Sequence, residues 1–141
     1  MDVKNKRVVV TGAASGIGKA LCEAFHQAEA KTVIAVDMNL EGAQDTADSV
    51  NGIAVQANVG NEEEIINVIQ KADEHAGGTD IFCSNAGIGG VPGFFEVGAS
   101  DWQNIWDVNV QSHIFAAKHV LPQMIERGEG YLVNTSSAAG L

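Results

Sequence analysis

Four short groups of residues combine types and spacings that suit the binding of a ligand. The first is a glycine-rich run from Thr11 to Gly18, of sequence T-G-A-A-S-G-I-G, and the second is a single acid, Asp37, 19 residues past Gly18. The third is the tripeptide 85–87, N-A-G, and the fourth is the tetrapeptide 134–137, N-T-S-S. Glycine turns bring backbone N–H groups close to a phosphate, and carboxylates accept hydrogen bonds from hydroxyls. The first two groups therefore favour nucleotide binding.

The glycine-rich run separates an apolar strand pattern from an apolar helix pattern. Gly12 allows a tight turn, Gly16 lets backbone N–H groups approach a ligand, and Gly18 lets the helix pack on the strand. A helix N-terminus there offers N–H groups and partial positive charge to a pyrophosphate. Asp37 ends the next strand, where its carboxylate can hold both ribose hydroxyls and repel a 2′-phosphate, which favours NAD over NADP. The alternative interpretation is a tight turn and a solvated Asp37.

Short apolar runs alternate with longer helical patterns along the chain. Strands are expected at 7–10, 31–37, 53–55, 80–83 and 131–134. Helices are expected at 17–25, 40–50, from 62 to the Gly77-Gly78 pair, and from a Ser100/Gln103 capping box to about 125, with a bend or early end at Pro122. This order predicts one α/β domain over residues 1–141 with a doubly wound parallel sheet. Ligands bind at the carboxyl edge of such a sheet, where every group above falls.

The spacing T-G-x-x-x-G-I-G, the N-A-G at 85–87, Asn109 within D-V-N-V and the N-T-S-S at 134–137 resemble the motifs of the short-chain dehydrogenase/reductase family. The resemblance covers the whole chain. It implies a Rossmann-type sheet of strand order 3-2-1-4-5-6-7, of which the last two strands are missing here. It also implies NAD(H)-dependent hydride transfer that interconverts a small-molecule alcohol and a carbonyl, in a homodimer or homotetramer when the protein is full length.

The resemblance assigns roles to residues of this chain. Asn109 would support a proton relay through its backbone carbonyl, and Ser137 would bind the substrate oxygen, with Ser136 as the alternative. Asn58 stands where the family usually has Asp, and Asn85 has a purely structural alternative as a turn residue. The cofactor-binding residues that the resemblance implies are Thr11, Gly12, Ser15, Gly16, Ile17, Gly18, Asp37, Asn58, Val59, Asn85, Ala86 and Gly87.

One expected catalytic feature does not occur in the sequence. The family places Tyr-x-x-x-Lys after the serine, but the only tyrosine is Tyr131, which precedes Ser137, and residue 135 is Thr. We therefore expect a chain truncated before the Tyr-x-x-x-Lys segment, with strand five as an exposed apolar edge. Two alternatives stay open: a catalytically incomplete dinucleotide-binding fragment or regulatory short form, and a methyltransferase with an adenosyl cofactor.

Composition excludes several function classes. The 141 residues carry 8 Lys and Arg against 18 Asp and Glu, a formal charge of -10, which argues against nucleic acid and anionic membranes as partners. No apolar stretch reaches the length of a membrane span and the N-terminus does not read as a signal peptide, so a cytoplasmic location is expected.

Several conspicuous side chains are expected to do no chemistry. Cys22 and Cys83 are expected to be small buried groups. No metal site is expected, because the four histidines do not form a metal spacing with carboxylates and none is expected on the ligand edge. Trp102 and Trp106 are expected to pack a helix, and Ile17 begins an apolar helix face. Val91, Phe94 and Phe95 are expected to form one apolar wall near the substrate.

Overall fold

The computed structural model describes residues 2–89, 93 and 95–137, and its centre is a parallel five-stranded sheet of order β3-β2-β1-β4-β5. The strands are β1 (Arg7–Thr11), β2 (Thr32–Asp37), β3 (Ile53–Gln56), β4 (Ile81–Ser84) and β5 (Tyr131–Asn134). Each expected strand is present, and the observed order confirms the Rossmann-type α/β fold.

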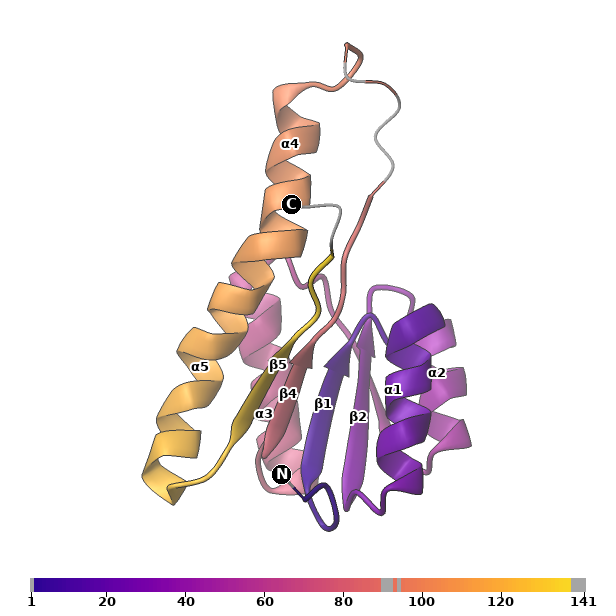
Figure 1. The fold of residues 1–141 in the computed structure, drawn as a ribbon, viewed down its shortest axis with the longest axis vertical. Coiled ribbons are helices and arrows are strands. Elements are labelled where there is room, and N and C mark those ends of the chain that lie inside the picture. Colours follow the sequence, from indigo (N-terminus) through magenta and orange to yellow (C-terminus); the bar gives the residue numbers. More distant parts are fainter. Residues whose placement is uncertain (1, 90–92, 94, 138–141) are drawn as a thin grey trace.

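Helices cover both faces of the sheet (Figure 1). They are α1 (Gly16–Gln27), α2 (Leu40–Ser49), α3 (Glu62–Ala76), α4 (Ala99–Trp106) and α5 (Ser112–Arg127). The α1 and α2 helices pack on one face, while α3 and α5 pack on the other; α4 extends beyond the carboxyl edge. All five strands point toward that edge, so the loops that follow them meet there.

Strand β1 shows why the sheet is buried on both sides. Val9 packs into the core layer with α3 and α5, while Val8 and Val10 pack into the layer with α1 and α2. All three are 0 % exposed. Because successive side chains of a strand point to opposite faces, an unbroken valine run suits a central strand with helices on both sides. Cys83 of β4 and Cys22 of α1 are both buried in the α1/α2 layer, as expected.

The long helix expected after residue 100 is divided into three parts. Its α4 part begins at Ala99, and the Asp101 carboxylate accepts a hydrogen bond from the Gly98 N–H at 2.9 Å. The Ser100/Gln103 capping box is therefore wrong, because the cap, formed by Gly98 and Asp101, lies two residues earlier. A π-helical segment, Asp107–Gln111, separates α4 from α5. An early end at Pro122 is also wrong, since α5 continues to Arg127.

Some large apolar residues of the helices face solvent. Trp102 and Trp106 are each 52 % exposed and Ile17 is 67 % exposed. Tyr131 and Val133 of β5 are also partly exposed, as expected of an edge strand. The tryptophans do not anchor their helix in the core, which corrects the expectation drawn from their four-residue spacing.

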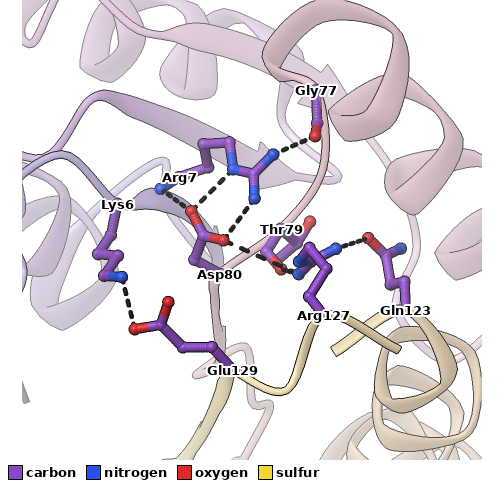
Figure 2. Close-up of polar contacts among 8 residues, drawn as sticks. All are labelled: Lys6, Arg7, Gly77, Thr79, Asp80, Gln123, Arg127 and Glu129. Atoms are coloured by element: carbon purple, nitrogen blue, oxygen red, sulfur yellow. Dashed lines mark hydrogen bonds and ion pairs between the residues drawn. The ribbon is translucent and has the colours of Figure 1, made fainter. Parts of the chain in front are cut away.

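A polar cluster closes the amino edge of the sheet, opposite the candidate site (Figure 2). The Asp80 Oδ2 atom accepts hydrogen bonds from the Arg7 backbone N–H at 2.9 Å and from Arg7 Nε at 2.7 Å, and Asp80 Oδ1 accepts one from Arg7 Nη2 at 2.5 Å. Arg127 donates to the carbonyl of Thr79 and lies 3.8 Å from Asp80 Oδ1. The Arg7 guanidinium holds the pKa of Asp80 below its usual range, so the carboxylate stays charged.

Across the part of the chain that the structure describes, no helix combines the length and apolar character needed to cross a membrane.

Candidate dinucleotide-binding site

The glycine-rich run forms a tight turn between β1 and α1, and close contacts leave no room for a side chain at two of its glycines, Gly12 and Gly18. Gly12 has a φ of +70°, a conformation that disfavours other residues. A Cβ atom on Gly18 would lie 2.0 Å from the Gly12 carbonyl oxygen, so only glycine fits where the helix meets the turn. These contacts hold the first turn of α1 directly against the end of β1.

The start of α1 leaves polar groups directed away from the protein core. The Lys19 N–H donates to the Ser15 carbonyl at 3.1 Å, so the amides of residues 16–18 precede the ladder of helical hydrogen bonds. Ser15 is the N-cap residue, yet its hydroxyl makes no capping hydrogen bond. Residues 15–17 are exposed and no atom lies within 4 Å of a Cβ built on Gly16. This turn can therefore accept a phosphate from solvent.

Asp37 ends β2 beside the glycine-rich turn, as expected. Its Oδ2 atom accepts a hydrogen bond from the Ala14 N–H at 3.0 Å, and its Oδ1 atom accepts one from the Asn39 N–H at 2.9 Å. Each carboxylate oxygen keeps a second lone pair for a ligand hydroxyl. Two backbone donors thus fix the orientation of the carboxylate before any ligand arrives.

A cavity of about 130 Å³ opens between these groups at the carboxyl edge of the sheet. It brings together residues from the loops after β1, β2, β3 and β4, which the sequence separates widely. Its lining consists of Gly12, Asp37, Met38, Ala57, Asn58, Val59, Ala86, Gly87, Ile88 and Val108. Six of the expected cofactor-binding residues are in this set: Gly12, Asp37, Asn58, Val59, Ala86 and Gly87.

Asn58 and Val59 form the wall of this cavity after β3. The Asn58 Oδ1 atom accepts a hydrogen bond from the Gly60 N–H at 3.0 Å, and the Asn58 N–H donates to Glu64 Oε2 at 2.7 Å. Val59 is 5 % exposed and presents an apolar surface to the cavity. A polar amide beside a flat apolar wall suits the edge and face of a purine base.

Asn85 lies next to the cavity but not in its lining. Its Nδ2 atom donates to the Thr11 carbonyl at 3.0 Å, and its Oδ1 atom accepts from Thr135 Oγ1 at 3.0 Å. Thr11 Oγ1 accepts hydrogen bonds from the backbone N–H groups of Asn85 at 2.9 Å and Ala86 at 3.0 Å. These contacts give the Asn85 side chain a structural role that ties β1, β4 and β5 together.

Asn109 occupies the π-helical segment and holds the loop after β4. Its Oδ1 atom accepts from the Ile88 N–H and its Nδ2 atom donates to the Ile88 carbonyl, both at 2.8 Å. The extra residue in a π-helical turn re-aims side chains locally, and such turns are frequent at functional sites. Asn109 thereby positions Gly87 and Ile88 at the mouth of the cavity.

The structure places the serine segment beyond the end of β5. Ser136 and Ser137 are exposed and lie outside regular strand geometry, so strand alternation does not decide which one faces the site. His113 Nδ1 lies 3.0 Å from Asn134 Oδ1 at the end of β5. The expectation that no histidine sits on this edge is therefore wrong.

Of the three residues expected to form an apolar wall near the substrate, Phe95 is 98 % exposed, while Val91 and Phe94 lie outside the described residues.

Three residues that position the site were not found from the sequence. Thr46 donates a hydrogen bond to the Ala13 carbonyl at 2.9 Å and is fully buried. Ile88 and Thr135 anchor the side chains of Asn109 and Asn85. The one signal in the sequence was Thr46 itself, because a threonine on the apolar face of a helix needs a hydrogen-bond partner when it is buried.

Comparison with known proteins places these features in a family. A family model described as short chain dehydrogenase matches residues 6–141. An uncharacterised oxidoreductase of Staphylococcus aureus strain USA300 is 34 % identical over 139 residues, which cover 96 % of this chain and 60 % of that protein. Glucose 1-dehydrogenase 2 of Bacillus subtilis strain 168 is 34 % identical over 143 residues, which cover 96 % of this chain and 55 % of that protein.

A third relative, an uncharacterised oxidoreductase of Staphylococcus aureus strain MRSA252, is 35 % identical over 141 residues. These relatives are oxidoreductases by name, and the chain spans 55 to 60 % of the length of the first two. The match to the family model, the strand order and the glycine-rich turn agree with one another, and together they favour a short-chain dehydrogenase over a methyltransferase. The chain belongs to the short-chain dehydrogenase family.

Proposed function

We propose that this chain is the dinucleotide-binding part of an NAD(H)-dependent oxidoreductase that interconverts an alcohol and a carbonyl. The observation that carries the proposal is the Asp37 carboxylate, held by two backbone N–H groups in a cavity that it shares with the glycine-rich turn. When bound, the nicotinamide dinucleotide supplies the hydride chemistry. One relative is named for glucose, which supports an alcohol as substrate class.

Each part of the dinucleotide has residues that suit it. The amides of residues 16–18 and the Ser15 hydroxyl would hold the pyrophosphate at the N-terminus of α1. Asp37 would accept hydrogen bonds from the adenosine ribose, and Asn58 and Val59 would border the adenine. Asp37 would repel a 2′-phosphate, and the neighbouring Met38 and Asn39 supply no positive charge to offset this.

The acid–base partner of the reaction would come from outside these 141 residues. Tyr131 begins β5, where it pairs with Ile81 at the amino end of the strands. The candidate site lies at the carboxyl end of the strands, so Tyr131 lies at the opposite edge of the sheet. Ser137 would bind the substrate oxygen and Asn109 would support the relay, but neither is a base at neutral pH.

The test is to titrate the chain with NADH and with NADPH and to measure binding by cofactor fluorescence and by calorimetry. We expect NADH to bind at least tenfold more tightly than NADPH. Asp37→Asn is expected to remove this preference, because the charge that repels the 2′-phosphate is gone. Asp45→Asn, an equal charge change on the exposed side of α2, is the matched control and should leave the preference intact.

Three results would contradict parts of the proposal. Binding of neither dinucleotide would refute the cofactor site. Equal binding of NADH and NADPH by the unaltered chain would refute the role of Asp37. Sustained reduction of NAD by an alcohol in the presence of this chain alone would refute an external acid–base partner.

A further inference from the structure

The side chain of Thr135 connects the serine segment to the glycine-rich turn through one intervening residue. Thr135 Oγ1 donates to Asn85 Oδ1 at 3.0 Å, and Asn85 Nδ2 donates to the Thr11 carbonyl at 3.0 Å. The two hydrogen bonds use opposite ends of one amide group. They therefore form a continuous link from the end of β5, across β4, to the end of β1.

The Asn85 amide is packed into the turn that it contacts. A Cβ built on Gly12 would lie 3.2 Å from Asn85 Nδ2, and one built on Gly18 would lie 2.9 Å from the same atom. The amide thus fills the space that both glycines leave open. Its orientation helps set the distance between the turn and the first residues of α1.

The carbonyl of Thr11 determines which way the amide faces, and the hydroxyl of Thr135 holds the opposite end of the amide in that orientation. An Asn side chain can be turned by 180° with little change of shape, so its orientation depends on its hydrogen-bond partners. The Thr11 carbonyl can only accept, so it binds the Nδ2 end, and the Thr135 hydroxyl then donates to the Oδ1 end. The Thr135 backbone N–H separately donates to the Ser84 carbonyl at 3.0 Å, so the strand end does not depend on the hydroxyl.

We propose that Thr135 is a positioning residue that couples the serine segment to the dinucleotide site through Asn85, so that binding of the dinucleotide and ordering of residues 135–137 favour each other. The coupling rests on the proposed function for its ligand. Reciprocity follows from linkage: if an ordered link improves binding, then binding must favour the ordered link by the same factor. Cofactor binding would in this way prepare the segment that holds Ser137.

The experiment compares Thr135→Val, which removes the hydroxyl and keeps the shape, with Thr135→Ser, which keeps the hydroxyl. We expect Thr135→Val to weaken NADH binding about fivefold, as loss of one neutral hydrogen bond predicts, and Thr135→Ser to restore it. Thr79→Val is the matched control: it lies at the amino edge, and Thr79 Oγ1 has no partner among the described residues. It should leave the NADH affinity unchanged.

Hydrogen exchange and the Asn85 side-chain amide signal by NMR separate positioning from general stability. NADH should slow exchange at the Thr135 amide in the unaltered chain and much less in Thr135→Val, at a temperature where both are fully folded. An unchanged NADH affinity in Thr135→Val, or equal protection in both proteins, would overturn the coupling.

The ligand-free protein provides a test that does not depend on the proposed function. Thr135→Val should shift the Asn85 side-chain signal and speed exchange at the Asn85 and Ala86 amides, which donate to Thr11 Oγ1. Failure of the unaltered chain to bind either dinucleotide would refute the proposed function, and with it the ligand half of the coupling. Unchanged Asn85 signals and exchange would refute the link itself.

Discussion

Replacement of Asp80 by asparagine tests the amino-edge cluster of Figure 2. The Asp80 side chain is 12 % exposed and accepts three hydrogen bonds from Arg7, one from its backbone and two from its guanidinium. Asparagine has nearly the same shape but replaces one acceptor oxygen with an NH₂ group. That group would face donors of Arg7, so at least one of the three bonds is lost and the Arg7 charge is left without its partner.

The size of the effect follows from these contacts. A hydrogen bond to a charged group contributes about 1.5–3 kcal/mol, and breaking a buried ion pair costs about 3–5 kcal/mol. Asparagine keeps one acceptor, and Arg7 retains 16 % exposure through which water can reach it. We therefore expect Asp80→Asn to lower the free energy of unfolding by about 3 kcal/mol. For a chain of this size that is about 10 °C in Tm.

The loss should depend on pH in a defined direction. Arg7 lowers the pKa of Asp80 in the folded protein, so the ion pair contributes stability above the unfolded pKa near about 3.9. That contribution disappears as the pH falls through the folded pKa. The difference between the two proteins should be constant from about pH 5 to 8 and should shrink at lower pH.

Urea denaturation at pH 7, 5 and 3.5 measures this difference. Glu129→Gln is the matched control, because Glu129 pairs with Lys6 in the same cluster but is 54 % exposed. Its effect should be too small to resolve. A loss below about 1 kcal/mol for Asp80→Asn at pH 7, on the ion-pair scale used above, would refute the reasoning. A difference that stays constant down to the most acidic pH would refute it as well.

Three further outcomes are expected. Gly18→Ala should reduce NADH affinity more than 100-fold in a fluorescence titration, since its Cβ would clash with the Gly12 carbonyl; an unaltered affinity would contradict the turn geometry. Asn39→Ala removes the side chain that caps α2 by accepting a hydrogen bond from the Gly42 N–H. It should lower the free energy of unfolding, measured by urea denaturation, by about 1 kcal/mol. Burial raises the pKa of Cys22 and of Cys83 to about 12. Alkylation of these thiols at pH 8 should therefore be far slower in the folded protein than in denaturant. Fast alkylation of the folded protein would show that the thiols are accessible.

The strands could be predicted because their signals are local and strong, whereas their order was predicted only through the resemblance to the family. The β1 valines occupy both faces of a buried sheet, and the glycines after β1 mark a turn whatever surrounds them. The start of the helix at Ala99 was harder to predict. Ser100 and Gln103 satisfy the capping pattern, but Asp101 reaches the Gly98 N–H first and sets the start of α4. The π-helical segment includes Asn109, whose two bonds to Ile88 depend on a loop 21 residues away.

In the candidate site, too, residues set by local patterns could be predicted and residues set by long-range contacts could not. Asp37 and the glycine-rich turn were found because a strand end and a fixed spacing place them together. The pairing of Asn85 with Thr135 joins residues 50 positions apart through one hydroxyl, and no spacing rule indicates it. The exposure of Trp102 and Trp106 was missed for a related reason: a four-residue spacing shows that two side chains share a helix face but not whether anything covers that face.

The central position of β1 has a consequence for how the chain is made. Strand β1 is synthesised before both of its neighbours and can pair with β2 early. Its other neighbour, β4, begins about 70 residues later, which is about 4–14 s of synthesis at about 5–20 residues per second. During that interval one edge of a strand that is buried in the finished sheet has no partner. The Arg7–Asp80 contact spans 73 positions and forms only when β4 arrives, so it marks the moment at which the nascent sheet closes that edge.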